Sequence, residues 1–152
     1  MKVATLILNR NLPKITDRLF NKIKKKNNIK NDIYIIESGS DKNKLSKNYS
    51  WWANWESARK KGLRPPRGFN YGLSKLINTN NFDKYDYFFL LTNDTEFKDE
   101  PFLEILVDEL DSHSKVGIIS PCASNWAEKE IIKKKKTKYF WYLQNTCYLF
   151  KK

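Results

Sequence analysis

The residues best suited to chemistry in this chain follow a short apolar run past its middle. Residues 92–96, Thr-Asn-Asp-Thr-Glu, come directly after the run 87–91, Tyr-Phe-Phe-Leu-Leu. The Asp94 carboxylate beside amide and hydroxyl oxygens is a hard-oxygen donor set, which suits Mg²⁺ or Mn²⁺ bound together with phosphate. The simpler interpretation is a turn, because Asn and Asp side chains bond readily to their own backbone.

The run 87–91 is the element that must position Asp94. It has no polar alternation, which is typical of a strand covered on both faces in a parallel sheet. Open α/β sheets bind ligands outside the carboxyl ends of their strands. Asp94 is therefore expected on a turn at the edge of the sheet where ligands bind.

The beginning of the chain predicts a strand-helix-strand unit. Residues 3–8 and 33–36 are apolar and strand-like, and Pro13 suits the first turn of the helix between them. Three apolar residues then recur at a spacing of four: Ile15, Leu19 and Ile23. The Asn-rich residues 27–31 end that helix. A unit of this kind predicts parallel strands with a right-handed crossover.

The later elements are a helix from Pro101 and strands at residues 116–119 and 146–150, with a further aromatic, strand-like segment at 139–142. Residues 42–66 form the least regular region and hold three tryptophans: Trp51, Trp52 and Trp55. These rings are suited to stacking a base or a sugar, but tryptophans more often cover the core or an interface.

Residues 64–72 are interpreted as a stiff loop, with a helix that starts near Leu73. Arg67 and Asn70 lie just before that start, where they could meet a phosphate from the N-terminal side of the helix. The alternative is a simple loop with a helix cap.

The whole chain has 152 residues, a net charge of +12 and a hydrophobic fraction of 40%. These values predict one globular domain, and no apolar run has the length of a membrane span. Two cysteines without metal-ligand spacing and no signal-like start predict a cytoplasmic protein. The lysine clusters at 22–30 and 129–138 form a solvated face or contact a polyanion or a membrane, so a peripheral position at the inner membrane surface is the alternative.

Four motifs, taken in order, resemble the family-two glycosyltransferases of GT-A fold. Residues 3–11 are similar to the first strand and its closing Asn, and residues 35–41 to the second strand and its Asp-Asn-Gly-Ser-x-Asp turn. Residues 67–72 are similar to the loop with Asn, one residue and Gly. Residues 90–96 come close to the Leu-Asn-Asn-Asp-Thr-Glu form of rhamnosyltransferase-like members.

The resemblance implies that Asp94 holds a divalent Mg or Mn cation and that Glu37 meets the nucleobase. The other residues that it places along the nucleotide sugar are Asn9, Arg10, Asn11, Arg67, Asn70 and Asn93. Two departures stand out, because Thr92 and Asn93 replace carboxylates of the metal motif and Glu37 replaces the usual Asp.

The resulting expectation is one α/β domain over residues 1–152, GT-A-like, with a Rossmann-like, mostly parallel sheet and helices on both faces. It would bind a nucleotide diphosphate sugar and transfer the sugar with inversion to a glycan or lipid-linked acceptor. The chain resembles only the front part of the family domain, and no residue matches the catalytic base. The alternatives are a non-catalytic domain that binds the nucleotide sugar and a basic nucleic-acid-binding domain, for which no motif is present.

Overall fold

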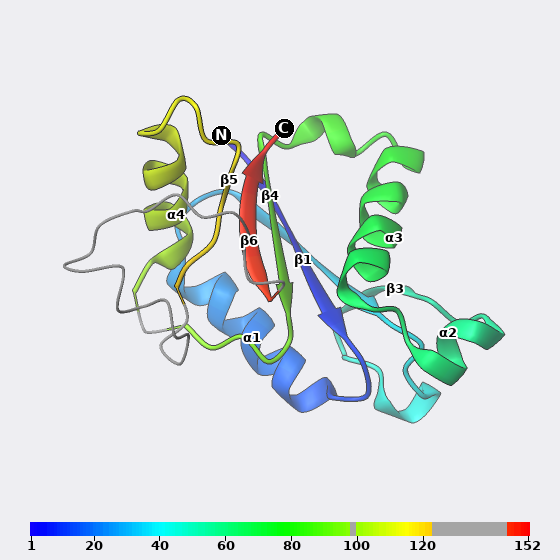
Figure 1. Cartoon of the computed structure of the whole chain (residues 1–152). Helices are drawn as coiled ribbons and strands as arrows, with labels where there is room; N and C mark the ends of the chain where they lie inside the picture. Colours follow the sequence, from blue (N-terminus) through cyan, green and yellow to red (C-terminus); the bar gives the residue numbers. More distant parts are fainter. Residues whose placement is uncertain (98–99, 123–145) are drawn as a thin grey trace.

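The computed structural model describes residues 1–97, 100–122 and 146–152, which form an α/β fold around one six-stranded sheet (Figure 1). The strand order is β3-β2-β1-β4-β6-β5. The strands are β1 (Val3–Asn9), β2 (Asn31–Glu37), β3 (Tyr49–Trp52), β4 (Tyr87–Thr92), β5 (Ile118–Ile119) and β6 (Cys147–Lys151). The helices are α1 (Pro13–Lys26), α2 (Glu56–Lys61), α3 (Pro65–Asn78) and α4 (Phe102–Asp111), with the short 3-10 helices η1 (Lys42–Lys44) and η2 (Phe82–Lys84).

The sheet is mixed rather than uniformly parallel. β1 pairs in parallel with β2 and with β4, and β2 pairs in parallel with β3. β6 runs antiparallel to both β4 and β5. The prediction of parallel strands is therefore confirmed for β1 to β4, whereas β6 reverses direction at the C-terminal end of the described chain.

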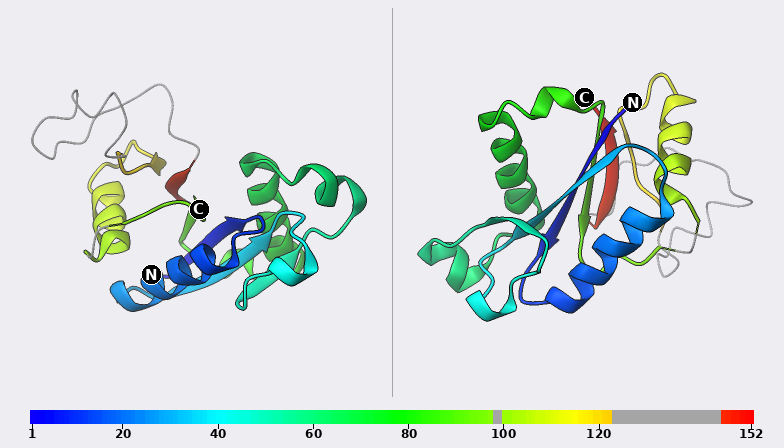
Figure 2. Two further views of the ribbon diagram at one scale, coloured as in Figure 1. Left: turned by 90° about the horizontal axis from the view of Figure 1, so that it is seen from below. Right: turned by 180° about the vertical axis from the view of Figure 1, so that it is seen from behind.

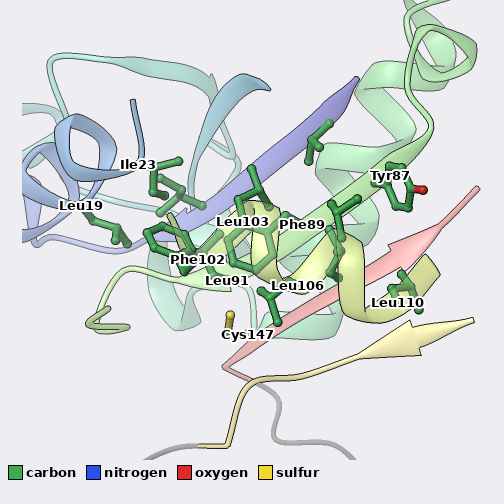
Figure 3. Close-up of a cluster of buried hydrophobic side chains, with 14 of the residues drawn as sticks. Leu19, Ile23, Tyr87, Phe89, Leu91, Phe102, Leu103, Leu106, Leu110 and Cys147 are labelled. Carbon is green, nitrogen blue, oxygen red and sulfur yellow. The ribbon is translucent and has the colours of Figure 1, made fainter. Parts of the chain in front are cut away.

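Helices cover both faces of the sheet, as the sequence predicts (Figure 2). Side chains of β1 alternate between the faces: Val3 and Ile7 enter one core, and Leu6 and Leu8 enter the other. The first core packs against α1 and α4, and Figure 3 shows side chains of both helices in one cluster with Phe89 of β4. The second core packs against α3.

The helix α1 follows its prediction closely. It begins at Pro13, and its C-terminal cap is Asn27. Leu19 and Ile23 are buried, but Ile15 is 38% exposed and does not belong to the core. The sequence pattern therefore predicted the helix correctly and placed one residue too many on its buried face.

The predicted loop over residues 64–72 is wrong. α3 begins at Pro65, so these residues form its first two turns. The glycines are positions of close packing against the sheet: a Cβ on Gly68 would lie 2.4 Å from Leu8 Cδ1, and a Cβ on Gly72 would lie 2.4 Å from Ile36 Cδ1. The two glycines allow the helix to approach the sheet closely. Glycine is also typical of turns, and for that reason the sequence pattern predicted a loop.

The tryptophan-rich region also contains more regular structure than predicted, namely β3 and α2. Trp51 stacks on Tyr34 with ring centroids 4.9 Å apart, and Trp52 Nε1 donates to the Ser40 carbonyl at 3.0 Å. Trp55 meets Tyr71 edge-on at 5.4 Å. Trp51 and Trp52 therefore pack against the protein, as the covering interpretation expects, whereas Trp55 remains 42% exposed.

None of the helices in the described ranges is both long and apolar enough to cross a membrane. The lysine cluster at 129–138 and the aromatic segment at 139–142 lie outside the described residues.

Candidate functional site

A cleft of about 440 Å³ opens at the carboxyl ends of β1 and β4. The two strands pair in parallel with Leu8 opposite Thr92, so the turns that follow them emerge side by side. Four residues predicted for the site line this cleft: Asn9, Arg10, Asn93 and Asp94. The remaining lining residues are Leu8, Leu12, Ser38, Leu63, Pro65, Thr92 and Thr146.

Asp94 is exposed on the turn after β4. Thr92 Oγ1 donates to Asp94 Oδ1 at 2.5 Å, and the Thr95 amide donates to the Thr92 carbonyl at 3.2 Å. The segment is thus a hydrogen-bonded turn, as the simpler interpretation expects, and it also presents an open carboxylate. Asp94 additionally lines a second cleft, of about 400 Å³, on the side of α1.

Asn9 and Asn93 are buried and hold the two strand ends together. Asn93 Nδ2 donates to Asn9 Oδ1 at 2.7 Å and to Thr16 Oγ1 of α1 at 3.2 Å. Asn9 Nδ2 in turn donates to both carboxylate oxygens of Glu37 at 3.0 Å. The hydrogen bonds of these two side-chain amides therefore stabilise the framework of the cleft.

Glu37, expected to meet a nucleobase, has an exposed fraction of 0%. Besides Asn9, its carboxylate accepts from Ser40 Oγ at 2.5 Å and from the Ser46 amide at 2.7 Å. A buried carboxylate needs such donors, because desolvation without them is costly. In this structure Glu37 anchors the loop after β2, and each of its oxygens already has two protein donors.

Arg10 and Asn11 connect the turn after β1 with its neighbours. Arg10 Nη2 lies 3.2 Å from the Arg59 carbonyl and 3.3 Å from the Lys60 carbonyl, where it caps the C-terminal end of α2. Asn11 has φ 58°, a left-handed conformation that Asn tolerates well. Its backbone amide donates to Ser40 Oγ at 3.1 Å, and its Oδ1 accepts from the Asp41 amide at 2.8 Å.

Arg67 and Asn70 lie exposed on α3 and not in the cleft between β1 and β4. Arg67 lines a neighbouring cleft of about 450 Å³ between α2 and α3, together with Lys60 and Lys61. The two clefts share Leu63. Four of the predicted residues thus line the cleft, Glu37 is a buried anchor, and Arg67 lines the adjoining cleft. Asn11 and Asn70 do not line either cleft.

Sequence reasoning missed three residues that shape the cleft. Ser38 Oγ donates to the Leu63 carbonyl at 2.9 Å and accepts from the Leu63 amide, which fixes the wall toward α3. The Thr146 carbonyl accepts from the Thr92 amide at 2.9 Å and from Thr95 Oγ1 at 3.2 Å. Ser38 belongs to the predicted polar turn after the second strand. No local sequence pattern indicates Leu63 or Thr146 as residues of the cleft, because only tertiary packing brings them there.

Within the described ranges, no group of three or more His, Cys, Asp or Glu side chains could hold a metal ion. Asp94 is the one carboxylate among the described residues that line the cleft. A single carboxylate nevertheless fits Mg²⁺, which commonly takes one or two carboxylates and completes its shell with substrate phosphate and water.

Comparison with known proteins adds no assignment: no family model matches the chain, and no curated protein matches it significantly.

Proposed function

We propose that the chain binds a nucleotide diphosphate sugar in the cleft between β1 and β4, through a divalent cation held by Asp94. The observation that carries the proposal is the position of the cleft in the sheet. From β1 the chain moves outward to β2 and β3, and it then returns to place β4 on the other side of β1. Ligands of open α/β sheets bind at such a switch point, outside the carboxyl ends of the strands.

The polar groups around the cleft suit a diphosphate. Asp94 would hold the cation, which would offset negative charge on the diphosphate. Arg10 lines the cleft, and Arg67 lies in the adjoining one, so cationic side chains flank it. The α/β fold is compatible with a Rossmann-like nucleotide-binding domain. Together with the resemblance to family-two glycosyltransferases, it supports a sugar nucleotide as the ligand, with inverting transfer to a glycan or lipid-linked acceptor as the associated reaction.

A second candidate is a domain that binds the nucleotide sugar without transferring it. Inverting transfer needs a base that removes the proton from the acceptor hydroxyl. Among the described residues that line the cleft, Asp94 is the only carboxylate, and the proposal already uses it for the cation. The later candidates Glu128 and Glu130 lie outside the described residues.

The test is calorimetric titration of uridine and thymidine diphosphates with Mn²⁺ and with chelator. We expect tighter binding with Mn²⁺, and we expect Asp94→Asn to remove the difference while the protein stays folded. The matched control is Glu96→Gln, which changes a neighbouring exposed carboxylate paired with Arg18 at 3.1 Å. Equal affinity with and without the metal would contradict a cation at Asp94.

A further inference from the structure

A patch of positive charge lies on α2, on the loop that follows it and on the first turn of α3. We call it the basic edge; it consists of Arg59, Lys60, Lys61, Arg64 and Arg67, all exposed. The one acidic residue in this stretch, Glu56, pairs with Lys60 at 2.6 Å. In the described part of the chain, the side chains of the other four cations make no hydrogen bond or ion pair, so they lack a countercharge.

An exposed aromatic ring adjoins the basic edge. Trp55 directly precedes α2 and is 42% exposed, although its ring is held edge-on against Tyr71. Indole rings favour the boundary between water and lipid headgroups, where one part of the ring is apolar and another polar. A fixed, half-exposed tryptophan beside several cations therefore suits a membrane surface.

The basic edge is also held in a defined shape. Gly62 ends α2 with φ 68°, and its amide donates to the Ala58 carbonyl at 2.7 Å. Arg10 caps the same helix end from the turn after β1. Figure 1 shows α2 at the outer edge of the molecule, so the part of the basic edge that belongs to α2 lies at the periphery of the fold.

We propose that the basic edge, with Trp55, binds the surface of an anionic lipid bilayer. Clusters of four to eight cations are typical of such binding, and each one near the surface strengthens it about fivefold. Single-stranded nucleic acids need several aromatic rings to stack successive bases, and Trp51 and Trp52 are already engaged with Tyr34 and Ser40.

This binding does not depend on the proposed function. If both hold, the contact of Arg10 with α2 places the cleft close to the bilayer, where an acceptor carried by a lipid would be found. Asp94→Asn is expected to leave membrane binding unchanged, so the failure of one proposal is distinguishable from the failure of the other.

The experiment is co-sedimentation of the whole chain with vesicles of phosphatidylcholine, with and without 30% phosphatidylglycerol. We expect binding only to the anionic vesicles, with loss at high salt because exposed charges are screened. The variant Arg59→Gln/Lys61→Gln/Arg64→Gln should weaken binding about a hundredfold. Trp55→Ala should weaken it about tenfold, if the ring contributes roughly 1.4 kcal/mol.

The matched control removes the same charge elsewhere, through Lys24→Gln/Lys25→Gln/Lys30→Gln on exposed positions around the end of α1. It should retain most of the binding. An equal loss in both triple variants would show that net charge rather than the basic edge is responsible, and would overturn the proposal. Failure to bind anionic vesicles, or tighter binding of an RNA oligomer through the same three residues, would overturn it as well.

Discussion

At the scale of single residues, the carboxylates Glu37 and Asp94 have opposite environments. Glu37 is fully buried and saturated with donors, whereas Asp94 is exposed and, within the described part of the chain, receives one hydrogen bond, from Thr92. The resemblance assigns both to the ligand. The structure supports a framework role for Glu37 and leaves Asp94 as the group available to a cation.

Glu37→Gln tests the framework role. The amide would present an NH₂ group to donors that now point at a carboxylate, and the charge-assisted hydrogen bonds would be lost. We expect the free energy of unfolding to fall by about 2–3 kcal/mol, measured by urea denaturation. Nucleotide affinity measured where the variant is still folded should change little; a large loss of affinity at unchanged stability would instead support direct contact with the base.

Arg67→Ala tests the cationic side of the site. A charge-assisted contact with phosphate is worth roughly 1.5–3 kcal/mol, so the affinity for a nucleoside diphosphate should fall at least about tenfold. The control is Lys75→Ala in the last turn of the same helix, where the ammonium lies 5.3 Å from the Tyr71 ring centroid. An unchanged dissociation constant would show that Arg67 does not contact the nucleotide. The nucleotide would then bind only in the cleft between β1 and β4.

At the scale of elements, sequence reasoning worked where one local pattern decides the structure. The apolar runs of β1, β2 and β4 and the start of α1 at Pro13 were predicted nearly to the residue. The start of α3 was predicted wrongly, because Gly68 and Gly72 are residues typical of turns but lie inside the helix, where they pack closely against the sheet. The site was predicted only in part. The residues after β1 and β4 were expected to meet because parallel strands end at the same edge of the sheet. The burial of Glu37 was not expected, because it depends on a hydrogen bond from Ser46 that no local sequence pattern indicates.

Gly72→Ala tests the close approach of α3 to the sheet. Alanine favours a helix by about 1 kcal/mol. However, its Cβ would lie 2.4 Å from Ile36 Cδ1 and 2.8 Å from Leu6 Cδ2, both side chains being fully buried. We expect overpacking to prevail and to lower the free energy of unfolding by about 1–3 kcal/mol. The control is Gly117→Ala, where a Cβ would meet nothing within 4 Å; equal stability of the two variants would contradict the packing argument.

At the scale of the whole molecule, the net charge of +12 acts over the whole surface. Individual polar contacts, in contrast, join segments that are distant in the sequence, and the contact between Tyr87 and Asp111 is one of them. Burial, together with a hydrogen bond to Asp111 at 2.7 Å, raises the pKa of Tyr87 to about 12. This contact links the start of β4 to the end of α4.

The raised pKa of Tyr87 predicts a loss of stability in alkali. The folded state holds the phenol proton more tightly than the unfolded chain, so the stabilisation is complete below an unfolded pKa of about 10. It is then lost as the pH rises to about 12. Tyr87→Phe should be less stable than the parent at pH 8, and the difference should shrink toward pH 12 in urea denaturation. A constant difference across that range would contradict a contribution from this proton.

The last prediction concerns turnover. A positioned base contributes about 10²–10⁴-fold to the rate. The described lining of the cleft offers Asp94 alone, which a bound cation would keep ionised and occupied. We therefore expect the chain to bind a nucleotide sugar but to transfer it very slowly or not at all, in an assay with several nucleotide sugars and a broad set of acceptors. Robust transfer that is lost in Glu128→Gln or Glu130→Gln would contradict this and identify the base. Transfer that survives both changes would also contradict it, and would direct the search to carboxylates on the α1 side of Asp94, beginning with Glu96.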